Sequence, residues 1–170
     1  MVTKIPLTQG KVALVDDEDA ERVQQYRWFA VNGHGGRWYA GRNVPDANGG
    51  QRRIHMHRLL LGDECEGKDV DHINSNTLDN CRENLRACTR AENMHNMRAR
   101  SRGRSRYKGV AWEERSKRWR AMIRITGHRR HLGYFVCAID AARAYDDAAR
   151  GQFGEYARLN FPGEGEQGAL

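Results

Sequence analysis

The chain has 170 residues, enough for one ordinary domain or for two or three small modules. Hydrophobic residues make up 39% of it and charged residues 30%, a composition typical of soluble proteins. No apolar run approaches the roughly 18 residues of a membrane-spanning helix, and the N-terminus has no apolar stretch of signal-peptide length. We therefore expect a cytoplasmic protein, neither secreted nor embedded in a membrane.

In the first 52 residues, short elements are expected in chain order. Residues 5–15 read as two strands broken at Gln9-Gly10, and an acidic run then opens a helix over about 16–25. Residues 28–31 and 37–40 read as strands joined by a glycine-rich turn. This part is predicted to be a small β-rich module.

The next segment, residues 53–97, is expected to form a strand–strand–helix unit. Residues 54–61 are apolar and read as a short helix, followed by strands over 70–73 and 83–87. Thr89 and Glu92 match the capping-box pattern, so a second helix is predicted from Thr89 to about Met97. A unit this small buries little core, and a bound cation could help to hold it.

Positive charge is concentrated after this unit. The net charge is +7, yet residues 98–130 alone hold 13 Lys or Arg and two Glu. Arginine occupies every second position from Arg98 to Arg106, with no apolar periodicity, so residues 98–106 are predicted to be a flexible linker along phosphates. Charge concentrated in this way favours a polyanionic partner over a solvated basic face.

Residues 107–162 are predicted to form a three-stranded antiparallel sheet packed on one helix. Strands are expected over 108–112, 118–125 and 129–135, and an alanine-rich stripe predicts a helix over 137–150. The second strand alternates: Trp119 and Ile123 share its apolar side, whereas Arg118 and Arg124 share the other. Residues 163–170 are expected to be a disordered tail.

Four polar residues of the central unit could hydrolyse a phosphodiester. Asn84 follows His72 by 12 residues and Asn93 follows Asn84 by nine. Asp71 and the amide oxygen of Asn93 are hard ligands suited to Mg²⁺. His72 is largely neutral at pH 7 and could act as a general base, with the side-chain carbonyl of Asn84 accepting from its Nδ1–H. On residue types alone, the Asp-His pair could instead cap a hairpin.

The spacing of these residues resembles a known family. The motifs that carry the resemblance are Val70-Asp-His-Ile-Asn74, Asp79-Asn80, Glu83-Asn-Leu-Arg86, Thr89 and Glu92-Asn93. They look like the HNH (ββα-metal) endonucleases, and more narrowly like their phage and bacterial homing endonucleases. The resemblance implies that Asp71 and Asn93 bind one Mg²⁺ or Mn²⁺ per active site, that His72 is the general base, and that Asn84 orients it.

Other candidate ligands fit less well. His95 would point about 200° away from Asn93 on a helix, so both cannot face one metal. His55 and His57 precede the motif and are read as structural or close to phosphate. The cysteines Cys65, Cys81, Cys88 and Cys137 form no C-x-x-C pair, so we expect reduced thiols. Their spacing disfavours zinc, although a zinc site that joins one of the first three to a histidine stays open.

A second resemblance covers residues 105–162. Tyr107-Lys-Gly-Val110, His131-Leu-Gly-Tyr-Phe135 and Leu159-Asn-Phe-Pro162 are similar to the plant ethylene-response-factor (Apetala-type) DNA-binding domain. That family lays a three-stranded sheet in the major groove. The resemblance implies that Lys108, Trp119, Arg124, Arg129 and His131 read bases or contact phosphates. The predicted DNA contacts also include the linker residues Arg98, Arg100, Arg102, Arg104 and Arg106, together with Trp112, Arg118, Arg120 and Arg130. Trp112 and Trp119 could instead pack the core. Ala111 and Glu113 depart from the plant pattern, so the plant target sequence is not transferred.

The sequence thus predicts an α+β protein that is a site-recognising DNA endonuclease resembling homing endonucleases. Its expected partner is double-stranded DNA and no membrane, and we expect a monomer or weak homodimer in a bacterial or phage-infected cell. Two alternatives stay open. One is a sequence-specific DNA-binding regulator with an inert nuclease unit, and the other is an RNA-binding or structural protein with an incidental Asp-His pair.

Overall fold

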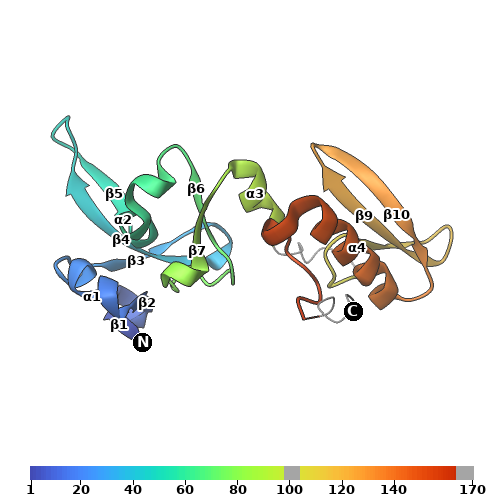
Figure 1. The fold of residues 1–170 in the computed structure, drawn as a ribbon, viewed down its shortest axis with the longest axis horizontal. Helices are drawn as coiled ribbons and strands as arrows, with labels where there is room; N and C mark the ends of the chain where they lie inside the picture. Colours follow the sequence, from blue (N-terminus) through green and yellow to red (C-terminus); the bar gives the residue numbers. More distant parts are fainter. Residues whose placement is uncertain (98–103, 164–170) are drawn as a thin grey trace. The chain divides into compact units, whose positions relative to one another are not determined.

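The computed structural model describes residues 1–97 and 104–163 and divides the chain into two compact units, Met1–Asn93 and Met94–Leu170 (Figure 1). Small antiparallel sheets and helices occur in both units, which confirms the predicted α+β class. Most of the predicted linker and tail, including Arg98, Arg100 and Arg102, lies outside the described residues. No helix in the described part is both long enough and apolar enough to cross a membrane.

The first unit contains three small sheets. Its elements are β1 (Val2–Pro6), β2 (Val12–Asp16), α1 (Asp17–Gln24), β3 (Phe29–Asn32), β4 (Trp38–Pro45), β5 (Gln51–His55), α2 (Met56–Leu61), β6 (Asp69–His72), β7 (Leu85–Cys88) and α3 (Arg90–His95). Strands β1 and β2 form one hairpin, β3-β4-β5 an antiparallel sheet in that order, and β6 and β7 a second hairpin. The strand–strand–helix order predicted for the central segment is therefore present in β6, β7 and α3.

Two predicted helix bounds differ from the structure. The helix expected over 54–61 begins only at Met56, because residues 54 and 55 end β5 by pairing with β4. The helix that follows Thr89 ends at His95 and does not reach Met97. Its predicted capping box is present: the Thr89 backbone N–H donates to the Glu92 carboxylate at 2.8 Å, and the Glu92 N–H donates to Thr89 Oγ1 at 3.3 Å.

One apolar core joins the N-terminal segment to the central segment. Val15, Val23 and Trp28 pack in the same cluster as Met56 and Leu85. An ion pair between residues 63 positions apart adds to it: Arg82 donates through Nε at 2.7 Å and Nη2 at 2.9 Å to Asp19, which is 5% exposed. The segments on either side of the predicted boundary at residue 52 thus share one apolar core. The five-segment division as a whole stays a prediction.

The second unit is a three-stranded sheet on one long helix. Its elements are β8 (Val110–Glu113), β9 (Arg118–Ile125), β10 (His128–Phe135) and α4 (Ala138–Phe153), with the sheet order β10-β9-β8. The predicted alanine stripe buries Ala141, Ala142 and Tyr145 against the sheet. Gly109 has φ +77°, and a Cβ there would lie 2.0 Å from the Tyr145 ring, so only glycine fits.

The alternation predicted for β9 is present. Ala121 and Ile123 are buried, whereas Arg118 and Arg124 are exposed. Trp119 is partly buried against the cluster around Ala141, which places it on the apolar side of β9 with no irregularity in that strand. The bulge of this sheet lies in β10, where the register shifts between His131 and Gly133.

Candidate active site

The β6–β7 hairpin fixes the carboxylate of Asp71. Asp71 faces Arg86 across the two strands, and Arg86 donates to Asp71 Oδ2 through Nε at 3.0 Å and Nη2 at 2.7 Å. Asp71 is 6% exposed and the Arg86 side chain 11%. A charge-assisted contact of this kind holds the orientation of a buried carboxylate.

Helix α3 brings Asn93 to the face of β6 that carries Asp71. Alternate residues of a strand share a face, so Asp69 and Asp71 point the same way. The Asn93 side-chain Nδ2 donates to Asp69 Oδ2 at 3.1 Å, which turns the amide and leaves its Oδ1 as the atom that could bind a cation. The described residues contain no group of three or more His, Cys, Asp or Glu that could hold a metal. A carboxylate and an amide oxygen do suit Mg²⁺, which keeps several waters and phosphate oxygens as ligands.

Asn84 holds the loop that directly follows His72. Its Oδ1 accepts from the Asn74 backbone N–H at 2.9 Å, and its Nδ2 donates to the Asp79 carbonyl at 2.7 Å. The Asn84 carbonyl also accepts from the Ile73 N–H at 2.9 Å. The Asn84 side chain thus bonds to backbone groups on either side of the loop, and its bond to the His72 ring stays a prediction.

His72 lies on the opposite face of β6 and is 4% exposed. The ring of His57 from α2 meets it edge-on, with centroids 5.2 Å apart, and that of Tyr39 from β4 lies 6.3 Å away. Burial lowers the pKa of His72, whereas the Asn80 side chain and the nearby carboxylates act in the opposite direction. Asn80 Oδ1 has no hydrogen bond of ordinary geometry within the described residues, so we treat Asn80 as a close polar neighbour of His72.

The other histidines have structural surroundings. His57 stacks on His55 with ring centroids 5.3 Å apart, and burial lowers the pKa of His57 to about 2, with smaller effects from His72, His55 and Arg58. His95, the last residue of α3, falls in the second unit and stacks there on Phe153 with ring centroids 3.7 Å apart.

The structure thus brings the four predicted residues together in part. Asp71 and Asn93 lie on one face of the unit formed by β6 and α3. His72 lies on the other face of β6, and Asn84 bonds to the loop that follows His72. Sequence reasoning gave no role to Tyr39, read His57 as structural or close to phosphate, and named Asn80 and Arg86 only as parts of the motifs that carry the resemblance. Only Arg86 left a usable signal, because hairpin pairing places it opposite Asp71.

Comparison of the sequence with known proteins points to the same segment of the chain. Residues 54–95 match a family model described as HNH endonuclease. The match covers about a quarter of the chain, and this segment is similar to HNH endonucleases. Protein 3.8 of Escherichia phage T7 is 28% identical over 82 residues, which cover 48% of this chain and 68% of that protein.

The second resemblance also has support. Dehydration-responsive element-binding protein 2A of rice (Oryza sativa subsp. indica) is 47% identical over 57 residues, or 32% of this chain and 20% of that protein. The Arabidopsis thaliana protein of the same name is 51% identical over 47 residues, or 26% of this chain and 14% of that protein. This chain therefore spans about a fifth or less of these plant proteins, and the likeness extends no further.

In the second unit, basic residues lie on the sheet face that points away from α4. Of the predicted contacts, Arg118, Arg124 and Arg129 are exposed, and Arg124 pairs directly with Arg129 across the strands. His131 and Arg130 are exposed as well. Three predicted contacts have acidic or aromatic neighbours: Arg120 pairs with Glu113 at 3.2 Å, Arg104 with Glu114 at 2.8 Å, and Arg106 lies beside the Tyr107 ring.

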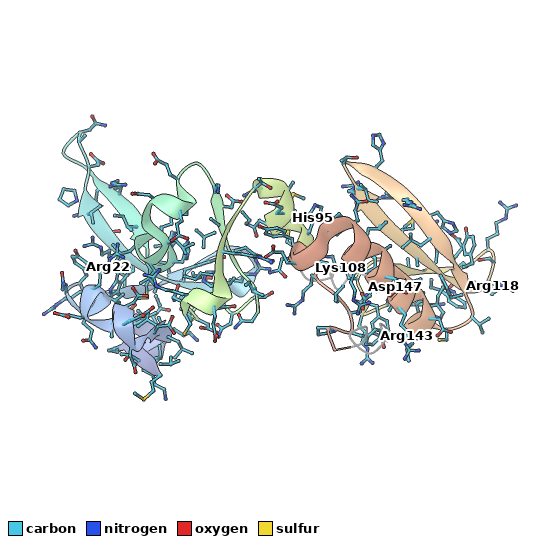
Figure 2. The ribbon with its side chains drawn as sticks, in the orientation of Figure 1. Arg22, His95, Lys108, Arg118, Arg143 and Asp147 are labelled. Atoms are coloured by element: carbon cyan, nitrogen blue, oxygen red, sulfur yellow. The ribbon has the colours of Figure 1, made fainter. Side chains whose placement is uncertain are left out.

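Three other predicted contacts take part in packing. The Lys108 Nζ donates to the His95 backbone carbonyl at the end of α3, and these two residues are adjacent in Figure 2. Burial lowers the pKa of Lys108 to about 8, and the charge of Arg158 adds to this effect. Trp112 and Trp119 meet edge-on at 5.2 Å, with Trp119 packed on the apolar cluster. Core packing, the alternative stated for the tryptophans, describes the surroundings of Trp119.

Proposed function

We propose that this protein is a site-recognising DNA endonuclease in which the β6–β7–α3 unit hydrolyses a phosphodiester bond. The observation that supports this most directly is the common face of β6 and α3, where Asp71 and Asn93 offer two oxygen ligands within a segment that is similar to HNH endonucleases. One such site per chain cuts one strand, so the protein nicks a duplex as a monomer or cuts both strands as a weak homodimer.

Asp71 and Asn93 would hold one Mg²⁺ or Mn²⁺. Bound there, the cation would neutralise the negative charge that develops on the phosphate and on the leaving oxygen. Arg86 fixes the orientation of the Asp71 carboxylate, and Asp69 orients the Asn93 amide. Both contacts organise the ligands before the substrate arrives, which reduces the cost of ordering them during the reaction.

His72 would take the proton from the attacking water. Its lowered pKa keeps the ring neutral at pH 7, which is the form that accepts a proton. The ring is 4% exposed, so this role requires the loop that follows β6 to move aside when DNA binds. Asn84 would act as a positioning residue, because its three bonds set the conformation of that loop.

The second unit would choose where cleavage occurs. Its exposed face carries Arg118, Arg124 and Arg129 on adjacent strands, a spacing suited to a major groove. The arginines of the linker would contact phosphates without reading sequence. The proposed partner is double-stranded DNA in a bacterial or phage-infected cytoplasm.

Nicking of a supercoiled plasmid tests the nuclease. With Mg²⁺ the intact protein should nick it, and EDTA should stop the reaction. Asp71→Asn and His72→Ala should each lower the rate about 100-fold or more, and added imidazole should restore part of the His72→Ala rate. Glu21→Gln, which likewise turns an exposed carboxylate of the same unit into an amide, should nick like the wild type. Nicking that survives both EDTA and His72→Ala contradicts the proposal.

A second candidate is a DNA-binding regulator whose nuclease unit is inert. The burial of His72 and the pairing of Asp71 with Arg86 favour it, because both residues already have partners inside the fold. This candidate predicts sequence-selective binding to duplex DNA and no nicking with any divalent cation. Selective binding together with EDTA-sensitive nicking would reject it.

A further inference from the structure

A basic groove of about 570 Å³ lies on the first unit, away from the residues assigned to DNA so far. It runs along the edge strand β5 and is bounded by α2 and by the C-terminal end of α1. Arg22 from α1, Arg52 and Arg53 from β5 and Arg58 from α2 line it. Figure 2 shows Arg22 between α1 and the β3-β4-β5 sheet.

The groove carries positive charge that the fold does not neutralise. Asp63 and Glu66 also line it, so four arginines stand against two carboxylates. Within the described residues, none of the four arginines takes part in an ion pair. An excess of unpaired guanidinium groups in a concave surface attracts an anion of matching shape.

Two of these arginines are held in place. Arg58 donates to the Lys68 carbonyl at 2.8 Å and to the Cys65 carbonyl at 3.3 Å. The guanidinium of Arg53 lies over the Phe29 ring at 5.6 Å from its centroid. Arg22 and Arg52 are exposed. Because the fixed pair has already lost side-chain freedom, binding an anion costs it less entropy.

We propose that this groove binds the phosphate backbone of duplex DNA and gives the first unit its own contact with the substrate. The proposal rests on the DNA endonuclease function and extends it, because the basic residues assigned before all follow residue 97. Guanidinium groups spaced along a groove match the repeated phosphates of a duplex, which each release condensed counterions when neutralised. The groove would hold the nuclease unit on DNA whatever the base sequence, while the second unit selects the site.

The salt dependence of binding tests this proposal without relying on cleavage. The full chain, in EDTA, is titrated with a mixed-sequence DNA duplex between 50 and 200 mM salt. Each phosphate contact contributes about 0.9 to the slope of log affinity against log salt, so Arg22→Gln combined with Arg52→Gln should lower that slope by about 1.8. These two arginines are exposed and distant from the apolar core, so the variant should keep the wild-type unfolding midpoint.

A matched pair separates the groove from net charge. Lys4→Gln with Arg27→Gln removes the same charge from exposed positions of the first unit outside the groove, and it should keep the wild-type slope. An equal decrease in both variants, or none in the groove variant, overturns the proposal. So does a decrease seen with duplex RNA and absent with duplex DNA. If the wild type binds with the steep slope but never nicks, the nuclease function fails while the groove assignment stands.

Discussion

Asn84 offers a decisive test of how the site is held. Asn84→Ala removes one bond to the Asn74 N–H and one to the Asp79 carbonyl. Asn84 is 6% exposed, but Asn74 is exposed and Asp79 half-buried, so water replaces part of what is lost. Two net hydrogen bonds with partly solvated partners correspond to about 1–3 kcal/mol of unfolding free energy. With a urea m-value of about 2 kcal/mol/M, the midpoint should fall by about 1 M.

Asn84→Asp separates two roles of this side chain. A carboxylate keeps an acceptor for the Asn74 N–H but turns the donor toward the Asp79 carbonyl into a second acceptor. If Asn84 acts by holding the loop, both variants should lose stability and about 10- to 100-fold of the nicking rate. If Asn84 only accepts a hydrogen bond from the His72 Nδ1–H, Asn84→Asp should remain active.

Urea titration and plasmid nicking measure these outcomes on the same preparations. Asn48→Ala and Asn48→Asp, in the exposed turn between β4 and β5, are the matched controls and should behave like the wild type. The loop-holding argument is refuted if Asn84→Asp equals the wild type in both stability and rate.

Three further predictions concern stability. Burial lowers the pKa of His57 to about 2, against about 6.5 in the unfolded chain. Below about pH 6.5 the unfolded chain therefore binds a proton that the folded chain does not, and the free energy of unfolding falls as the pH drops. His57→Gln should flatten this fall, as measured by the urea midpoint at a series of pH values. Asp146→Ala should cost about 3 kcal/mol in urea titration, because its buried carboxylate accepts three backbone or amide N–H groups, whereas Asp147→Ala at an exposed position should change little. Gly109→Ala should abolish the cooperative thermal transition of the second unit. Gly127→Ala, with an equally positive φ but open space around it, should lower the free energy of unfolding by about 1 kcal/mol. Equal effects of the two substitutions would contradict the packing argument.

Local patterns predicted much of the fold. The period-two alternation of 118–125, the alanine stripe of α4 and the Thr89–Glu92 capping box each depend on neighbours within a few residues, and all three are present. Strand β5 escaped prediction because it carries charged residues on an exposed edge and gains its structure from pairing with β4.

The candidate site was predictable only in part, for a physical reason. Hairpin pairing and helix return give the positions of Asp71 and Asn93 from local rules. The surroundings of His72 come from Tyr39 and His57, which reach it through the packing of β4 and α2. No local pattern encodes such contacts, so the burial of the His72 ring and the backbone bonds of the Asn84 side chain appear only in the folded chain.

The common core of the first unit limits how the proposed nuclease unit can be moved between proteins. A family match that begins at residue 54 suggests a portable cassette of about forty residues. Yet Met56 and Leu85 pack against Val15, Val23 and Trp28, and Arg82 neutralises the buried Asp19. A cassette cut at residue 54 would expose that apolar surface and lose its ionic partner. A chimera built from this chain therefore has to carry residues 1–53 together with the proposed nuclease unit, whatever DNA-binding domain is attached after it.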